Sequence, residues 1–252
     1  MNTHKLFSDK SEIYAKARPR YPKELYEWLA EVCQSTEKVW DAACGSGQAA
    51  VDLRNYFDFV EASDISSEQI ENAPEYDRVN FSIQASESTH FDDNSFDAVC
   101  VAQSLHWFHY DTFWPEVKRV LKPSGVFAAW GYTWPRLGTP LDGILNKTFL
   151  KIIKPYWAPQ NRLLWNGYTD VNFPFTPLHP PIFNMCVDWN VNDFFTYLHS
   201  WSAVRRCMDD IGEDFFHESY EQMKFLWGDE KRRKVSMEFF FIAGRNGSTL
   251  LA

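Results

Sequence analysis

The stretch KVWDAACGSGQ, residues 38–48, decides the fold. Its first part, 38–42, is typical of a short buried strand, and a helix is expected over 48–55. Between them lie Gly45 and Gly47, and glycines are needed where a ligand comes so close to the backbone that a Cβ would collide. Units of this kind bind nucleotides at the carboxyl end of the strand. The loop lacks the Lys-Ser/Thr pair of a P-loop, so it does not carry that signature of nucleoside triphosphatases.

Short apolar segments alternate with helical patterns along the rest of the first half. Strands that alternate with helices are joined by right-handed crossovers, so the sheet is predicted to be mainly parallel. Two later strands would close it as a hairpin-like edge pair, which makes it mixed. The predicted fold class is therefore α/β: a Rossmann-like seven-stranded mixed sheet, mostly parallel with an antiparallel last strand, with helices on both faces and an inserted cap. The expected strands are 38–42, 59–62, 79–83, 96–102, 125–130, 183–189 and 235–243, and the expected helices are 22–34, 48–55, 66–72, 111–121, 141–154, 191–206 and 213–227.

A single domain is expected, with two special segments. Residues 1–21 are polar and run into Pro19 and Pro22, which break any helix that passes through them. Residues 132–181 contain eight of the 13 prolines and one helical stretch. We expect this second segment, with an outer limit at residue 230, to form a cap that contacts the substrate over the open edge of the sheet.

The composition is that of a globular protein with many aromatic rings. Hydrophobic residues make up 45% and charged residues 23%, while Phe, Trp and Tyr together reach 17%. This aromatic content fits an aromatic-lined pocket and a core of large side chains equally well. The net charge of −9 argues against a nucleic-acid or anionic-membrane partner, because both require a positive field. The basic run KRRK, 231–234, is interpreted as a solvated turn.

The five cysteines show no spacing typical of metal ligands, so no metal is expected. Their odd number and the polar N-terminus argue against secretion. No apolar stretch reaches about eighteen residues, the length that a membrane span requires. We therefore expect a cytoplasmic protein without a membrane partner; the oligomeric state stays open.

Asp64 follows the second predicted strand, about twenty residues beyond the glycine loop. A carboxylate there can accept hydrogen bonds from both ribose hydroxyls of an adenosine, which is the interpretation we prefer. The alternative is that Asp64 only favours the positive end of the following helix. An NAD-dependent dehydrogenase would share the glycine loop and the acidic residue after the second strand. Its loop, however, has the pattern GxGxxG where this chain has DxxCGSG, and the sequence offers no convincing set of catalytic residues for hydride transfer.

Further motifs follow the later strands, and together they carry a resemblance. The chain resembles the class I S-adenosylmethionine-dependent methyltransferases of the methyltransferase-type-11 group, and within that group it is similar to trans-aconitate methyltransferase-like proteins. The resemblance covers the chain to about residue 130 and continues only loosely through Trp201 and the final strand. It is carried by YAKARPRYP (14–22), DAACGSG (41–47), Ser86-Glu87, QSLHWF (103–108) and EVKRVLKPSG (116–125).

The resemblance implies S-adenosyl-L-methionine as the cofactor. The sequence departs from the family at Ala43, where a glycine is usual, and an alanine is tolerated there if its φ stays negative. The implied cofactor residues are Tyr14 and Arg18 in an N-terminal segment over the cofactor, Asp41, Ala43, Gly45 and Gly47 at the methionine and ribose part, Asp64 and Ile65 at the ribose, Ser86 and Glu87 beside adenine, and Gln103 close to the sulfonium.

The acceptor side is expected to include Tyr21, His106, Trp107 and Trp201. A sulfonium methyl group is already an activated electrophile, so the protein must mainly align it and exclude water. The sequence accordingly offers no Ser/His/Asp set. His106 is the candidate for a base or a substrate-orienting group, with a structural histidine as an equal alternative, and Trp107 is interpreted as a packing wall.

We expect methyl transfer to an oxygen of a small-molecule acceptor. A carboxylate is favoured over a hydroxyl or an amine, because it is ionised at neutral pH and needs no base. Arg18 would pair with such a carboxylate by bidentate geometry, and Arg205 and Arg206 are weaker candidates. A protein that has kept the cofactor site and lost catalysis stays open as an alternative, next to the dehydrogenase.

Overall fold

The computed structural model describes residues 18–138, 140–228 and 231–247. The expected site residue Tyr14 and most of segment 1–21 lie outside the described residues. The chain divides into two compact units. Within the described residues, unit 1 comprises 18–20, Trp134–Asn161 and Met185–Glu238, and unit 2 comprises Tyr21–Thr133, Arg162–Asn184 and 239–247.

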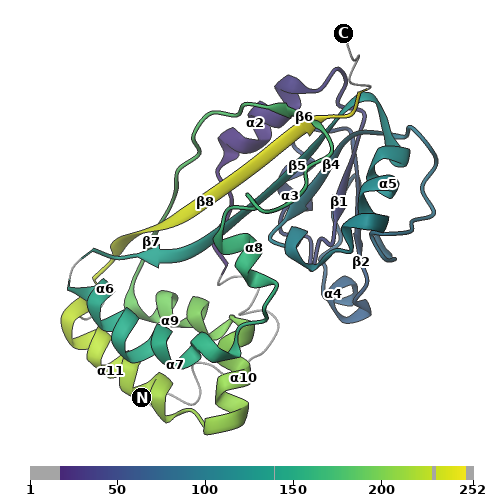
Figure 1. The fold of residues 1–252 in the computed structure, drawn as a ribbon. Coiled ribbons are helices and arrows are strands. Elements are labelled where there is room, and N and C mark those ends of the chain that lie inside the picture. Colours follow the sequence, from purple (N-terminus) through teal and green to yellow (C-terminus); the bar gives the residue numbers. More distant parts are fainter. Residues whose placement is uncertain (1–17, 139, 229–230, 248–252) are drawn as a thin grey trace. The chain divides into compact units, whose positions relative to one another are not determined.

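The strands of the described residues form one mixed sheet (Figure 1). They are β1 (Lys38–Ala42), β2 (Phe59–Asp64), β3 (Val79–Ile83), β4 (Phe96–Ala102), β5 (Leu121–Arg136), β6 (Thr176–Leu178), β7 (Met185–Trp189) and β8 (Arg233–Arg245). Their order is β3-β2-β1-β4-β5-β8-β6, and β7 also pairs with β8. The pairs β1–β2, β1–β4, β2–β3 and β4–β5 are parallel, whereas β6 and β7 run antiparallel to β8. The predicted fold class is confirmed.

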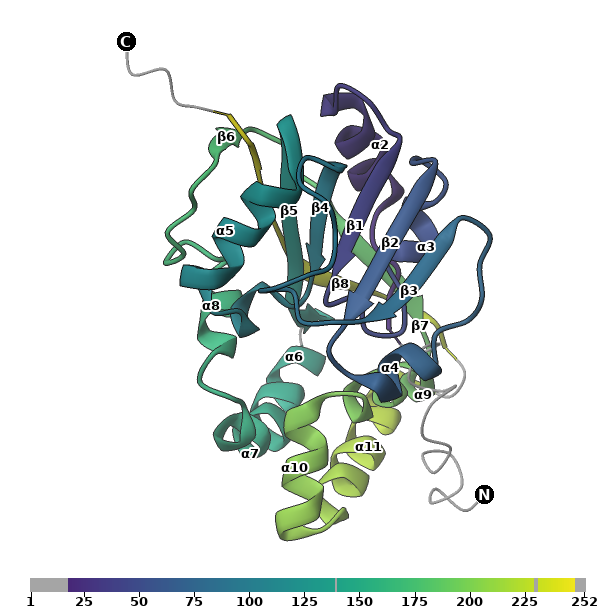
Figure 2. The same cartoon turned by 90° about the vertical axis from the view of Figure 1, so that its right-hand side faces the viewer.

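Helices cover both faces of the sheet in unit 2. Figure 2 shows α5 on one face and α2 and α3 on the other. The helices are α2 (Lys23–Val32), α3 (Ala50–Leu53), α4 (Ser67–Glu71), the 3-10 turn η2 (Leu105–Trp107), α5 (Tyr110–Val120) and α8 (Asn161–Trp165), which begins at the unit boundary. The core under α5 is aromatic: Trp114 packs edge-on against Phe127 at 5.2 Å and against Phe175 at 5.7 Å.

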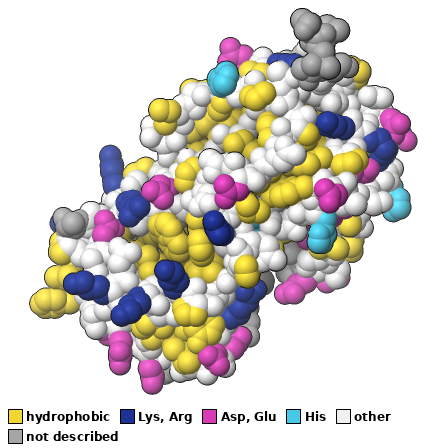
Figure 3. All heavy atoms as spheres, viewed as in Figure 1, with side chains coloured by type: hydrophobic (Ala, Val, Ile, Leu, Met, Phe, Trp, Pro, Cys, Tyr) yellow, Lys and Arg dark blue, Asp and Glu magenta, His cyan; other side chains and the backbone are white. Residues whose placement is uncertain are grey.

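Unit 1 is mainly helical. Its helices are α6 (Leu141–Ile144), the π-helical turn η3 (Leu145–Leu150), α7 (Lys151–Ile153), the 3-10 turn η4 (Lys154–Tyr156), α9 (Val191–His199), α10 (Ser202–Ile211) and α11 (Asp214–Trp227). Phe149 and Phe195 each pack on Phe216, at 5.7 and 5.3 Å between ring centroids. On the face drawn in Figure 3, basic and acidic side chains are interspersed over these helices. In the part of the chain that the structure describes, no helix is long and apolar enough to cross a membrane.

Several bounds differ from the sequence-based expectation. The expected helix over 141–154 is interrupted by the π-helical turn η3, within which Thr148 Oγ1 donates to the carbonyl of Ile144 at 2.9 Å; such side-chain bonds disturb a regular helix. Strand β6 was not predicted and makes the sheet eight-stranded in place of seven. It is three residues long and contains Pro177, which an edge strand tolerates.

The expected cap, 132–181, divides between the units. Its part 134–161 lies in unit 1, and 162–181 lies in unit 2. The second part belongs there because Phe173 and Phe175 pack on Phe127 of β5, at 5.8 and 5.3 Å between ring centroids. That residues 132–181 contact the substrate as a cap stays a prediction.

Candidate functional site

The loop that follows β1 holds three residues in the left-handed backbone region. Ala43, Gly45 and Gly47 have φ values of 54°, 56° and 85°. A Cβ on Gly47 would lie 2.6 Å from Cζ of Phe81, so glycine is needed at this point. For Ala43 the expectation of a negative φ is wrong. The alanine takes a conformation that costs an L-residue about 1 kcal/mol, because the course of the loop imposes it.

Asp64, the last residue of β2, fixes this loop. Its Oδ2 accepts from the N–H of Gly45 at 2.8 Å, and its Oδ1 accepts from the N–H of Ser66 at 2.9 Å. The N–H of Cys44 donates to the carbonyl of Ser63 at 2.9 Å, which adds a second tie between the loop and β2. A carboxylate offers about four lone-pair sites, so both oxygens of Asp64 keep capacity for further donors. Asp64 therefore lies beside the glycine loop, able to accept from hydroxyl groups of a ligand.

Asp41 presents a buried carboxylate with no hydrogen-bond partner in the described part of the chain. The residue is 0% exposed, and neither Oδ1 nor Oδ2 is bonded. Burial raises the pKa of Asp41 from 3.8 to about 7; the amide of Ala50 offsets part of this rise, and the charge of Asp64 adds to it. The Ala50 amide faces the carboxylate without a hydrogen bond of ordinary geometry. A buried carboxylate without compensation is costly, and an ammonium group is the kind of ligand group that would compensate it.

The rest of the expected cofactor set lies where β2, β3 and β4 end. Ile65 is 74% exposed, Ser86 is buried, and Glu87 accepts from the N–H of His109 at 3.3 Å. Ile83, the last residue of β3, is the register partner of Asp64 and is 56% exposed. The sequence analysis missed it, although its place as the last apolar residue of a predicted strand was a usable signal. Ile65 and Ile83 give this edge an apolar surface that suits a flat ring such as adenine.

Gln103, directly after β4, joins the ends of two strands. Its N–H donates to the carbonyl of Trp130 at 2.8 Å, and its Nε2 donates to the carbonyl of Tyr132 at 3.2 Å. Its φ is 60°, again in the left-handed region. The remaining side-chain atom, Oε1, is buried and has no partner among the described residues.

His106 lies in the 3-10 turn after Gln103 and is 4% exposed. Burial lowers its pKa from 6.5 to about 4, so the imidazole is neutral and weakly basic near pH 7. Its ring packs against Trp107 at 4.7 Å and against Tyr168 at 6.5 Å between centroids. This environment suits an orienting or packing role better than that of a base, while Trp107 next to it is 46% exposed.

The other expected acceptor residues fall in both units. Tyr21, in unit 2, is buried and packs edge-on against Trp130 at 5.7 Å. Trp201, in unit 1, packs against Trp134 at 6.0 Å and Trp157 at 5.5 Å. Unit 2 thus brings together Asp41, Asp64, Gln103 and His106, whereas Arg18, Trp201, Arg205 and Arg206 belong to unit 1.

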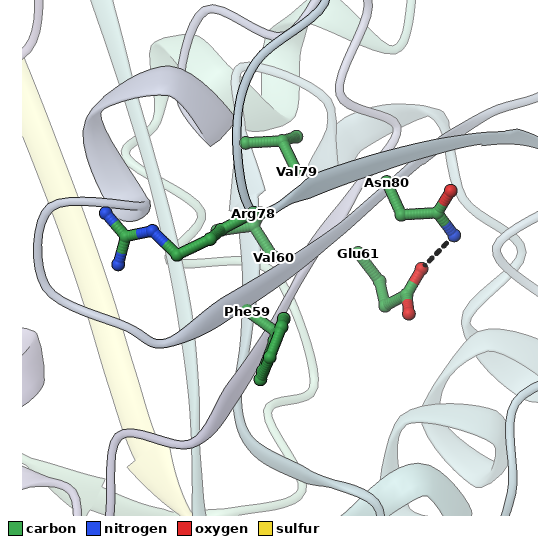
Figure 4. A pocket seen from close by; sticks show the side chains of 6 residues that line it. All are labelled: Phe59, Val60, Glu61, Arg78, Val79 and Asn80. Atoms are coloured by element: carbon green, nitrogen blue, oxygen red, sulfur yellow. Dashed lines mark hydrogen bonds between the residues drawn. The ribbon is translucent and has the colours of Figure 1, made fainter.

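One pocket in the described part of the chain does not contribute to this site. A pocket lined by Phe59, Val60, Glu61, Arg78, Val79 and Asn80 lies at the amino ends of β2 and β3, the opposite edge from the glycine loop (Figure 4). Glu61 accepts there from Asn80 Nδ2 at 2.7 Å, so these two polar side chains already bond to each other. No group of three or more His, Cys, Asp and Glu side chains within the described ranges is arranged to hold a metal ion.

All five cysteines lie in the described part of the chain and are free thiols. Cys44 is in the glycine loop, where burial and the charges of Asp41 and Asp64 raise its pKa well above the ordinary value. The thiol is therefore protonated and unreactive at neutral pH, in agreement with a packing role.

Comparison with known proteins agrees with this geometry. The family model of the methyltransferase domain matches residues 40–129. A solved structure from Anaeromyxobacter dehalogenans, assigned as a type II methyltransferase, is 33% identical with a TM-score of 0.85, and the match covers 91% of this chain and 98% of that one. A Dictyostelium discoideum protein assigned as a methyltransferase is 29% identical over 95% of this chain and 94% of its own length. An uncharacterised methyltransferase of Schizosaccharomyces pombe is 23% identical over 91% of this chain and 92% of its own.

These relatives argue against one of the alternatives that the sequence left open. They are methyltransferases over nearly the whole chain, which argues against the dehydrogenase. The similarity to trans-aconitate methyltransferase-like proteins stays a prediction. The chain belongs to the class I S-adenosylmethionine-dependent methyltransferases and is an enzyme that uses S-adenosylmethionine.

Proposed function

We propose that this enzyme methylates an oxygen of a small molecule, with a carboxylate as the first candidate, and that the glycine loop holds the cofactor. The observation that carries the cofactor site is the buried carboxylate of Asp41, which has no partner in the described part of the chain. The cofactor carries an ammonium group that matches it in charge and donors. When bound, S-adenosylmethionine supplies an electrophilic methyl group.

The residues around Asp41 have separate tasks in this proposal. Asp64 accepts from the ribose hydroxyls with the lone pairs that Gly45 and Ser66 leave unused. Ile65 and Ile83 cover the adenine, with Ser86 and Glu87 beside it. Gln103, at the end of β4, lies toward the sulfonium. Arg18 and Trp201 stay expected contacts of the cofactor and of the acceptor, respectively.

The preference for a carboxylate rests on the lack of a strong base. His106 has a pKa of about 4, so it would take a proton from a hydroxyl or ammonium acceptor inefficiently. A carboxylate needs no deprotonation before it attacks a methyl group. Arg18, Arg205 and Arg206 are the candidates to anchor its charge. The net charge of −9 and the free thiols fit a small acceptor in the cytosol rather than a nucleic acid or a membrane.

The test uses methyl-labelled S-adenosylmethionine and a panel of small acids, including trans-aconitate, together with alcohols, phenols and amines. A methyl ester releases its label as methanol in mild alkali, whereas an ether or a methylamine does not. Alkali-stable product alone would rule out the carboxylate. Replacing Asp64 with alanine should weaken S-adenosylhomocysteine binding in calorimetry at least about tenfold, or about 1.4 kcal/mol; unchanged affinity would refute the ribose assignment.

A further inference from the structure

Two buried polar atoms lie close to each other beside Gly131, within unit 2. A Cβ built on Gly131 would lie 2.9 Å from Oε1 of Gln103 and 3.4 Å from Oη of Tyr168. Neither oxygen has a hydrogen-bond partner among the described residues. Cδ1 of Leu164 lies 2.4 Å from the same point, so the end of this flexible side chain must shift before a ligand atom can enter between the two oxygens. Gly131 directly follows Trp130, the β5 partner of the last β4 residue, which places the pair at the end of the sheet that carries the glycine loop.

The backbone holds both side chains in place at some cost. Tyr168 is 3% exposed and has φ of 61°, directly after Gly167 at 61°. Its N–H donates to the carbonyl of Leu163 at 2.8 Å, and its ring stacks on His106. Gln103 shares the left-handed conformation and is anchored through Nε2 to Tyr132. Non-glycine residues in this region are strained, and strain of this kind gathers at functional sites.

The chemistry of the pair is complementary to one kind of group. The bond from Nε2 to Tyr132 fixes the amide orientation, so Gln103 offers an acceptor at Oε1. Burial raises the pKa of Tyr168 well above its ordinary value, so the phenol stays protonated and can donate. A carboxylate would be repelled by Oε1, and an ammonium group cannot accept from the phenol. A hydroxyl group can do both.

We propose that Gln103 Oε1 and Tyr168 Oη bind a hydroxyl group of the methyl acceptor and so determine its specificity. The inference rests on the proposed function and deepens it, because it makes the acceptor a hydroxylated small molecule, whichever of its oxygens is methylated. Sites built to hydrogen-bond a hydroxyl reject analogues that lack it, because their own buried polar groups are then left unpaired.

Tyr168→Phe is the informative variant, because it removes one oxygen and keeps the ring. The hydroxyl has no partner to lose, so the Tm of the ligand-free protein should stay the same or rise. A clear fall in Tm would show that the hydroxyl is bonded within the folded protein, and it would overturn the inference. Tyr76→Phe, in a half-buried tyrosine whose ring lies under Arg54, is the matched control.

Binding is measured as the Tm shift with saturating S-adenosylhomocysteine and matched acids that differ by one hydroxyl: malate and succinate, lactate and propionate, 4-hydroxybenzoate and benzoate. In the wild type and in Tyr76→Phe at least one hydroxylated member should bind tenfold or more tightly than its partner, and Tyr168→Phe should lose that preference. No hydroxyl preference in any pair, or a preference that survives in Tyr168→Phe, refutes the proposal. Hydroxyl-dependent binding without labelled product would instead refute the proposed methyl transfer, so the two failures are distinguishable.

Discussion

Replacing Asp41 with asparagine tests the central feature of the cofactor site. The side chain keeps its shape and loses its charge. In the wild type the folded state binds its proton more tightly than the unfolded chain does, since burial raises the pKa from 3.8 to about 7. Between these two values the folded state holds more protons, so the free energy of unfolding falls as pH rises through this window.

The size of the effect follows from the same numbers. A rise from 3.8 to about 7 corresponds to about 4 kcal/mol, at about 1.4 kcal/mol per pKa unit. The wild type should therefore lose up to about 4 kcal/mol of stability above pH 7 that Asp41→Asn does not lose. The new amide adds its own cost of about 1–3 kcal/mol if it stays unbonded, but that cost is nearly the same at every pH.

The assay is urea unfolding of the ligand-free wild type and variant at pH 4, 5, 6, 7 and 8, with Asp58→Asn as a control at an exposed carboxylate. The quantity compared is the difference in unfolding free energy between the two proteins as a function of pH. A difference that stays constant from pH 4 to pH 8 would refute the buried, uncompensated carboxylate. Calorimetry at pH 8 should also show that Asp41→Asn binds S-adenosylmethionine at least about tenfold more weakly, because the substitution removes the negative charge that pairs with the ammonium group of the cofactor.

Two further substitutions probe the same unit. Ala43→Gly should raise the free energy of unfolding by about 0.5 kcal/mol, since it relieves a φ of 54° at the cost of a more flexible unfolded chain; a lower Tm would contradict the left-handed loop. His106 has its pKa lowered from 6.5 to about 4, so the wild type should lose up to about 3 kcal/mol as pH falls through that range. His106→Gln should lack this loss, and equal pH dependence in urea unfolding would show that the imidazole is not buried neutral.

Strand positions in the first half could be predicted because the apolar runs are short and sharply bounded. Residues 38–42, 79–83 and 96–102 match β1, β3 and β4 without change. In contrast, β5 extends on both sides of the expected 125–130 through Pro123 and Pro135, which a sequence pattern takes as strand ends.

The candidate site could be predicted where a residue follows a strand. Asp64 and Gln103 lie at the carboxyl edge for this reason. Tyr168 could not be found in the same way, because it follows neither β4 nor β5 in the sequence and reaches Gly131 only through the turn at Gly167. The left-handed conformation of Ala43 could not be predicted from the sequence either, because an alanine prefers a negative φ and the loop imposes a positive one.

The free thiols give the chain a natural attachment point for a probe. Cys100 and Cys207 are buried, and burial raises the pKa of Cys33 to about 12 and that of Cys44 above its ordinary range. Cys186 on β7 is the exposed one among the five, all of which are described. A maleimide dye should therefore react at Cys186 of the unmodified protein and spare the glycine loop. Fluorescence from that single position, in unit 1, can then follow ligand binding without any engineered cysteine.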